Sequence, residues 1–82
     1  MISKILFFGA AKEIVGASEK KLELPENSTA QTAFETILEN HPELRERFGK
    51  SLLFAVNQTY ANGAEIIQNN DELAVFPPVS GG

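Results

Sequence analysis

A single amphipathic helix, with strand patterns before and after it, points to a fold in which one helix packs on a sheet. Ser28 and Gln31 have the spacing of a capping box and predict the start of the helix. Asn40 and Pro42 predict its end. Between these signals, apolar side chains recur at helical spacing and form one stripe, made of Ala30, Ala33, Phe34, Ile37 and Leu38. Because such a stripe must be buried against another element, the flanking strands are expected to form a sheet beneath it.

The first strand is predicted over residues 2–8, a run of β-branched and aromatic side chains. Since side chains alternate along a strand, Ile5 and Phe7 share one face. Leu6 and Phe8 share the other face. Two apolar faces predict either a central strand or a strand whose outer face meets a partner. We expect Phe7 to belong to the core and Phe8 to lie at an interface.

Further strands are predicted on both sides of the helix. Charged and apolar residues alternate over 19–24, which predicts a strand with a charged outer face, paired antiparallel with the first strand. Residues 10–15, between these two strands, predict one helical turn or a loop. The elements predicted after the main helix are a short helical turn at 42–48, a strand buried on both faces at 52–56, a minor strand at 58–60 and a last strand at 73–76.

This order of elements predicts an α+β fold with a mixed sheet packed against one main helix. A right-handed crossover from the strand before the helix to a strand after it would make that pair parallel. The arrangement is the β-grasp, the ubiquitin-like architecture. With 82 residues the chain forms one domain, which we place at residues 1–76. Residues 77–82 are expected to form an extended tail that ends in two glycines.

Charge and cysteine content exclude several classes of function. The chain has no Cys, which excludes disulfides, thiolate catalysis and thiolate zinc sites. It is also consistent with a reducing compartment, and we expect the cytoplasm. A net charge of −4 argues against a nucleic-acid partner and suits a basic protein partner. No apolar stretch approaches the roughly 18 residues that span a bilayer, so no membrane partner is expected.

No convincing side-chain active site emerges from the sequence. His41 is the only histidine and lacks a partner for a triad or a metal site, so we expect a surface histidine near the helix C-terminus. Several carboxylates recur at three- or four-residue steps, which is typical of a solvated helix face. They belong to Glu35, Glu39, Glu43 and Glu46. We therefore expect no metal site and no bound cofactor.

The carboxyl-terminal residues carry the candidate chemistry. Phe76, Pro77, Pro78 and Val79 continue the last strand into a segment that cannot become helix, which predicts a stiff, extended, apolar arm. Glycines at the end allow close approach to another surface. The α-carboxyl of Gly82 is an anion at neutral pH, and it could attack the α-phosphate of ATP held by a partner enzyme. A sulfur or amine nucleophile could then displace AMP from the acyl-adenylate.

The sequence resembles the small subunit of molybdopterin synthase, a ubiquitin-like sulfur carrier. The resemblance covers essentially the whole chain and is carried by residues 4–8, 12–16 and 55–59. The most specific segment is 71–82, in which Asp-Glu, an apolar strand, a double proline and the terminal Gly-Gly all match.

The resemblance implies a role for each residue of the site. Gly82 would be adenylated by an E1-like adenylyltransferase that uses ATP and magnesium, and a sulfur donor protein would supply the sulfur of a thiocarboxylate. Gly81 would be its flexible neighbour. The large synthase subunit would then transfer the sulfur to precursor Z (cyclic pyranopterin monophosphate), in a heterotetramer to which this chain contributes no active site of its own. Residues that match partner-binding positions are Phe8, Lys12, Phe76, Pro77, Pro78, Val79 and Ser80.

Three other functions stay open at the level of sequence. A protein modifier would be joined through Gly82 to lysines of other proteins. A thiamine-thiazole sulfur carrier shares the fold and the ending, but it is usually shorter and lacks the double proline. A plain binding module would need no chemistry at the terminus.

Overall fold

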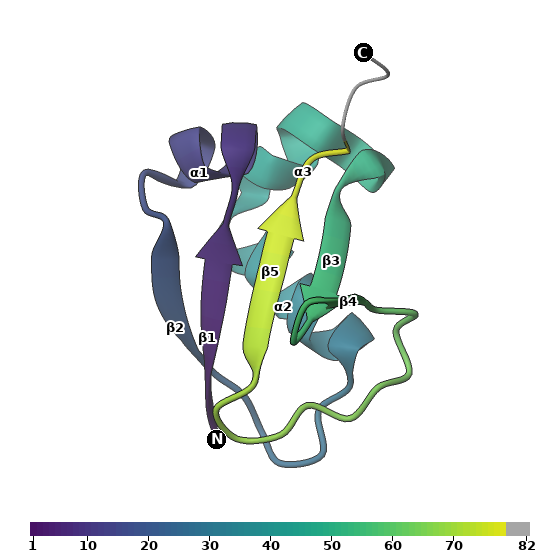
Figure 1. Cartoon of the computed structure of the whole chain (residues 1–82). Coiled ribbons are helices and arrows are strands. Elements are labelled where there is room, and N and C mark those ends of the chain that lie inside the picture. Colours follow the sequence, from purple (N-terminus) through teal and green to yellow (C-terminus); the bar gives the residue numbers. More distant parts are fainter. Residues whose placement is uncertain (79–82) are drawn as a thin grey trace.

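The structure, a computed structural model, describes residues 1–78, except for the side chain of Lys50. A five-stranded sheet forms one layer, and α2 and α3 lie behind it in the view of Figure 1. The elements in chain order are β1 (Ile2–Phe7), α1 (Gly9–Val15), β2 (Glu19–Glu23), α2 (Ala30–Asn40), α3 (Pro42–Phe48), the 3-10 turn η1 (Gly49–Ser51), β3 (Leu53–Val56), β4 (Thr59–Tyr60) and β5 (Glu72–Phe76). This is the predicted α+β architecture. Within residues 1–78 no helix has the length and apolar character needed to cross a membrane.

The strand order in the sheet is β2-β1-β5-β3-β4. β1 pairs antiparallel with β2 and parallel with β5, and β3 pairs antiparallel with both β5 and β4. The predicted mixed sheet and the β1–β2 pairing are confirmed. β2, the strand directly before α2, runs in the same direction as β3, the first strand after it, as the crossover predicted. The two strands are not neighbours, because β1 and β5 lie between them, and the hydrogen-bonded parallel pair at the centre of the sheet is β1 and β5.

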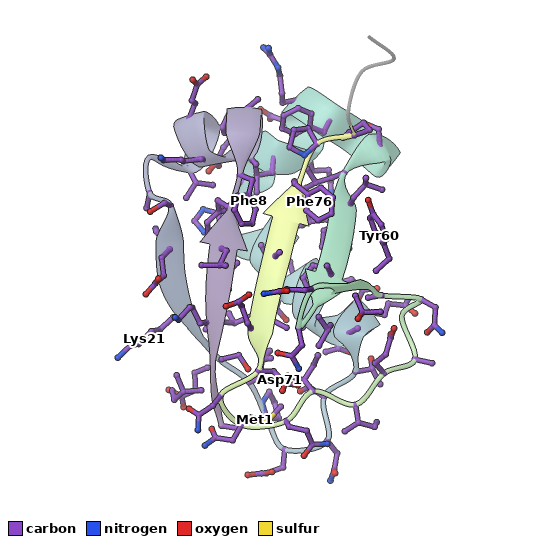
Figure 2. All side chains as sticks on the ribbon, in the orientation of Figure 1. Met1, Phe8, Lys21, Tyr60, Asp71 and Phe76 are labelled. Atoms are coloured by element: carbon purple, nitrogen blue, oxygen red, sulfur yellow. The ribbon has the colours of Figure 1, made fainter. Side chains whose placement is uncertain are left out.

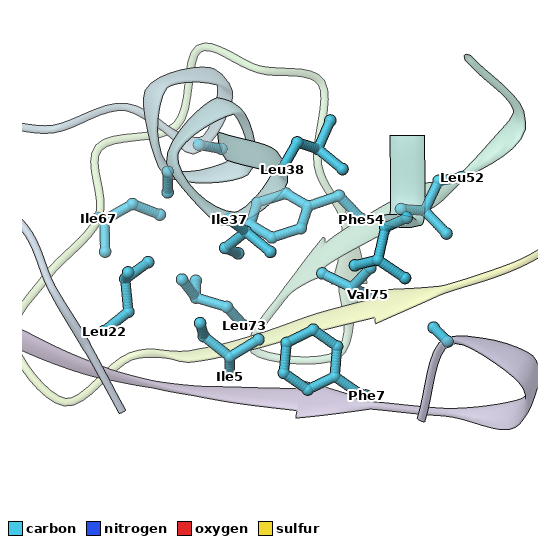
Figure 3. Packing of buried hydrophobic residues seen from close by; sticks show 14 of the residues in the cluster. Ile5, Phe7, Leu22, Ile37, Leu38, Leu52, Phe54, Ile67, Leu73 and Val75 are labelled. Carbon is cyan, nitrogen blue, oxygen red and sulfur yellow. The ribbon is translucent and has the colours of Figure 1, made fainter. Parts of the chain in front are cut away.

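The core lies between α2 and the inner face of the sheet (Figure 3). Ala30, Ala33 and Ile37 of the predicted stripe are fully buried. From the sheet, Phe7 and Val75 face them, as the alternation along β1 and β5 requires. Phe7 is 1% exposed, which confirms its prediction as a core residue. A large apolar side chain buried in this way contributes about 1.5–3 kcal/mol to stability.

The main helix begins one residue later than predicted. Thr29 is the N-cap, and its side-chain oxygen accepts a hydrogen bond of 3.2 Å from the Thr32 N–H. The Ser28 hydroxyl instead donates to the Pro25 carbonyl at 2.7 Å. The backbone at 28–29 is extended and bonded to residues 66 and 67, through the Thr29–Ile66 bridge and the bond from the Ile67 N–H to the Ser28 carbonyl. The backbone is still extended at Thr29 and becomes helical at Ala30, so Thr29 and not Ser28 is the N-cap.

The segment from Asn62 to Glu65 closes the N-terminus of α2. The Ala30 N–H donates to the Glu65 carbonyl at 2.8 Å, and the Gln31 N–H donates to the Gly63 carbonyl at 3.0 Å. The Glu65 carboxylate accepts bonds from the N–H groups of Asn62 and Gly63, at 2.8 and 2.9 Å. These bonds, with that to Asn62 the largest cause, lower the pKa of the Glu65 carboxyl, because they stabilise its charged form.

The shorter elements follow their predictions with shifted bounds. Residues 9–15 form the helix α1, which extends the single turn expected there, and 42–48 form α3. The minor strand contracts to Thr59–Tyr60, and the last strand gains Glu72. The first strand ends at Phe7, because Phe8 becomes the N-cap of α1.

Candidate docking groove at the root of the tail

The outer face of the sheet points away from α2 and α3, and its side chains follow from the strand register. Leu6 lies beside Ala74 on β5, and Ala74 lies beside Ala55 on β3. Ala55 is in turn opposite Tyr60. These side chains share the outer face, and they form an apolar row across β1, β5, β3 and β4. Figure 2 shows Phe8, Phe76 and Tyr60 on this side of the sheet.

The outer face becomes charged toward β2. Glu19, Lys21 and Glu23 are exposed, as predicted for this strand, and Leu22 between the last two is buried. Lys20, which was expected on the inner side, is exposed as well. Lys4 of β1 lies in register with Lys21, and its ammonium group is 3.9 Å from the Glu19 carboxylate. An exposed ion pair of this kind contributes at most about 1 kcal/mol. The face therefore divides into a charged strip and an apolar region.

The apolar region is hollowed into a groove of about 1020 Å³, which we call the tail-root groove. Ala55 and Ala74 line it centrally, where larger side chains would fill the hollow. Its apolar lining also includes Leu6, Phe8, Tyr60 and Phe76, and its polar lining residues are Gln58 and Glu72. Gly9, Pro77 and Pro78 complete the lining, so the groove runs up to the start of the tail.

Exposed aromatic side chains make the groove a candidate docking surface. Phe8 is 49% exposed and Tyr60 is 69% exposed. Phe76 is half-buried, and its ring centre is 5.8 Å from that of Tyr60 in a tilted arrangement. Large aromatic rings at the centre of an apolar patch are the residue types that dominate binding energy at protein interfaces. The exposure of Phe8 agrees with its prediction as an interface residue.

Backbone contacts fix the root of the tail against α1. The Phe8 N–H donates to the Val75 carbonyl at 3.2 Å and ties the end of β1 to β5. Gly9 then adopts φ +57°, a left-handed conformation that favours glycine. A side chain at Gly9 would begin 3.7 Å from the ring of Pro77, so the first proline of the tail lies directly over this turn.

The structure brings four of the predicted site residues together. Phe8, Phe76, Pro77 and Pro78 line the tail-root groove. Lys12 is exposed in the last turn of α1 and does not line the groove. The other predicted residues, Val79, Ser80, Gly81 and Gly82, lie outside the residues that the structure describes.

Sequence reasoning did not assign a role to Tyr60, Ala55 or Ala74. Tyr60 lies in a two-residue strand, for which the only signal was an aromatic residue near the Asn-Gly turn. The two alanines come side by side only through the β3–β5 register, a long-range pairing that local pattern does not fix.

His41 differs from its predicted surface position. It is the C-cap of α2, as expected near the helix end, but its side chain is only 14% exposed. Its ring packs edge-on against Phe7 with centres 5.5 Å apart, and Nδ1 is 3.4 Å from a Glu43 carboxylate oxygen. His41 is the single residue between α2 and α3, as the C-cap of one helix and the N-cap of the other, so its side chain lies where the two helices meet. Residues 1–78 contain no cluster of three potential metal ligands.

Comparisons with known proteins agree with the resemblance noted in the sequence. The model of the ThiS family matches residues 5–82. The molybdopterin synthase sulfur carrier subunit of Caenorhabditis elegans is 42% identical, over all of both chains.

Solved structures show the same fold. SAMP1 from Haloferax volcanii superposes with a TM-score of 0.86 at 26% identity, over all of both chains. A chain in the complex of subunits 1 and 2 of the molybdopterin-converting factor from Helicobacter pylori gives a TM-score of 0.71 at 20% identity, again over both whole chains, and shows the fold alone. The ubiquitin-like fold is thus confirmed, and the chain belongs to the ThiS family, as its resemblance to the sulfur carriers of molybdopterin synthase led us to expect.

Proposed function

We propose that this chain is the sulfur carrier subunit of a molybdopterin synthase, and that its reactive group is the α-carboxyl of Gly82. The observation that carries the proposal is the tail-root groove, an exposed aromatic surface that adjoins the start of the tail. A surface in this place can hold a partner while the tail extends into that partner's active site. The similarity to the sulfur carrier subunit of C. elegans supports the same function.

Docking uses the aromatic residues of the groove. Phe8, Tyr60 and Phe76 present large apolar surfaces that a partner would bury, and Ala55 and Ala74 leave room for a side chain of the partner between them. The large synthase subunit is the proposed partner, and the H. pylori complex of subunits 1 and 2 contains a protein of the same fold in such an assembly. The E1-like adenylyltransferase is proposed to use the same groove, because it must reach the same tail.

In this proposal the tail extends into the active site of a partner enzyme, and the partner enzyme catalyses the reaction. Pro77 and Pro78 lack N–H groups and have a fixed φ, so this part of the tail resists folding into a helix. Glycine residues at 81 and 82 carry no Cβ, which permits entry into a narrow channel. Neither role requires a reactive side chain from this chain.

The proposed chemistry proceeds in three steps. A carboxylate oxygen of Gly82 attacks the α-phosphate of magnesium-bound ATP, which forms an acyl-adenylate and releases pyrophosphate. Sulfide-level sulfur released by the donor protein attacks the carbonyl carbon, and AMP leaves, so that a thiocarboxylate remains. In the large subunit the thiocarboxylate sulfur bonds to a carbon of precursor Z and displaces an oxygen leaving group from it, and water then hydrolyses the acyl carbon–sulfur bond and restores the carboxylate.

The test is the mass of the intact protein after incubation with the adenylyltransferase, magnesium, ATP and a sulfur donor. The expected gain equals the difference between a sulfur and an oxygen atom, located at Gly82. A variant with one alanine added after Gly82 should show no gain. A matched variant with one alanine before Met1 should react normally, because Met1 lies at the opposite end of the sheet from the end of β5 (Figure 1). Equal reaction of both variants would refute the role of Gly82.

A protein modifier is the second candidate, and the similarity to SAMP1, described as a small archaeal modifier protein, favours it. The activation step would be the same, but a lysine amine would displace AMP and form an isopeptide bond. Gly-Gly remnants on lysines of cellular proteins would support this function. Their absence, together with detectable thiocarboxylate, would support the sulfur carrier. The acceptor of the sulfur separates a molybdopterin carrier from a thiamine-thiazole carrier.

A further inference from the structure

The segment that closes the N-terminus of α2 contains a dipeptide with chemistry of its own, Asn62–Gly63. In an Asn-Gly sequence the backbone nitrogen of glycine can attack the side-chain carbonyl carbon of asparagine, since glycine has no Cβ to obstruct the approach. A new N–C bond closes a cyclic imide, the C–N bond of the side-chain amide breaks, and ammonia leaves with the proton of the glycine N–H. Water then opens the ring and leaves aspartate or isoaspartate.

Hydrogen bonds hold the attacking nitrogen and the side-chain oxygen of the group that it would attack. The nitrogen that would attack, of Gly63, donates its proton to a Glu65 carboxylate oxygen at 2.9 Å. The second oxygen of the same carboxylate accepts from the Asn62 N–H at 2.8 Å. The Asn62 side-chain oxygen accepts from the Ala64 N–H at 2.8 Å, and the Gly63 carbonyl accepts from the Gln31 N–H. For the attack, the Gly63 nitrogen must approach the Asn62 side-chain carbonyl carbon by rotation about single bonds of Asn62. This movement would break the hydrogen bonds just described.

The negative charge of Glu65 should slow the deamidation further. The amide nitrogen attacks after it loses its proton, and the resulting negative charge would lie beside the carboxylate that had accepted the proton. Like charges at hydrogen-bond distance disfavour ionisation of the second group. Asn62 is also exposed, so access of water does not limit the reaction. The rate of deamidation is therefore expected to depend on the hydrogen bonds to Glu65.

We propose that Asn62–Gly63 is a site of spontaneous deamidation and that the Glu65 carboxylate slows the reaction in the folded protein. The modification matters for the fold because isoaspartate adds a methylene group to the main chain within this segment. The carbonyls of Gly63 and Glu65 would then shift from the N–H groups of Gln31 and Ala30, which they bond in the intact chain. Deamidation would thus loosen the start of α2. The proposal is independent of the sulfur-carrier function.

The experiment compares the wild-type chain with Glu65→Ala during incubation in mildly alkaline buffer. Digestion and mass spectrometry measure aspartate and isoaspartate formed at Asn62 over time. We expect the reaction at Asn62 to be at least several-fold faster in Glu65→Ala. Gln68→Ala, which truncates an exposed side chain that makes none of these bonds, should react at the wild-type rate.

Asn27, which precedes Ser28 in a different loop, serves as an internal control. Its rate should be the same in all variants that stay folded, so a rise at Asn62 alone separates the loss of the bonds from general unfolding. A rate at Asn62 that is unchanged or lower in folded Glu65→Ala would overturn the proposal, and a lower rate would identify Glu65 as a base that promotes attack. If Glu65→Ala does not fold, wild-type rates with and without urea decide: a folded chain that deamidates as fast as the denatured chain contradicts the proposal.

Discussion

Phe7 and Phe8 are neighbours in sequence that serve opposite purposes, because successive residues of a strand face opposite sides of the sheet. Phe7 points into the core and contacts His41, whereas Phe8 points into the tail-root groove. The alternation along the first strand was enough to predict both positions. The position of His41 could not be predicted in this way, because it depends on how α3 turns back after α2.

Truncation of these two rings should therefore have opposite consequences. Phe7→Ala is expected to lower the free energy of unfolding by about 3–5 kcal/mol, since it opens a cavity in the core. Phe8→Ala should change the unfolding free energy little but weaken binding to the large subunit by about 2 kcal/mol or more. Urea denaturation and calorimetric titration measure the two quantities. A large loss of stability in Phe8→Ala would show that Phe8 is a core residue and not a docking residue.

The elements of the fold differ in how far the sequence specifies them. The stripe of α2 and the alternation of β1 are local patterns, and both predict the observed burial. The alternation of β2 predicts the burial of Leu22 but not the exposure of Lys20. The parallel pairing of β1 with β5 and the contact of Ala55 with Ala74 join residues far apart in the chain, so no local pattern encodes them. For the same reason the sequence predicted four residues of the groove, Phe8, Phe76, Pro77 and Pro78, but it could not predict the shape of the groove.

The cap of α2 gives a prediction at the scale of one element. Thr29→Ala removes the side-chain oxygen that accepts from the Thr32 N–H, and it should lower the unfolding free energy by about 1 kcal/mol. Replacing Thr29 with serine keeps an oxygen in the same place and should restore most of the loss. Equal stability of the alanine and serine variants would contradict the assignment of Thr29 as the N-cap.

The segment that closes α2 predicts a pH dependence. Its bonds hold the pKa of Glu65 below the ordinary value of 4.5, so the charged carboxylate stabilises the folded state. This contribution is complete at pH values above the unfolded pKa and is lost as the pH falls through the lower, folded pKa. The stability difference between the wild-type chain and Glu65→Gln should therefore shrink as the solution is acidified through this range. A difference that stays constant or grows in acid would have the wrong sign.

For the molecule as a whole, the outer sheet face divides into a charged part and an apolar part, and docking is proposed for the apolar part alone. Charged side chains cover the part over β2, and apolar side chains surround the hollow beside the tail. The groove lies beside the start of the tail, and both proposed partners need the tail. They would therefore compete for the groove. The adenylyltransferase and the large subunit are therefore expected to exclude one another.

A bulky charge inside the groove should block both partners together. Ala74→Lys places a long cationic side chain in the hollow and is expected to abolish measurable binding to the adenylyltransferase and to the large subunit. Lys21→Glu changes a charge on the same face outside the groove and should leave both interactions within a few-fold of wild type. Loss of only one of the two interactions in Ala74→Lys would show that the partners use different surfaces.

The most direct test of the central claim is the mass of the intact chain, purified from its own cells after deletion of the large subunit. Without the large subunit to accept the sulfur, the thiocarboxylated form of the carrier should accumulate. The account predicts a population in which sulfur replaces one oxygen, and fragmentation should locate the sulfur at Gly82. A chain that carries only an ordinary carboxylate there, in cells whose adenylyltransferase and sulfur donor are active, would contradict it.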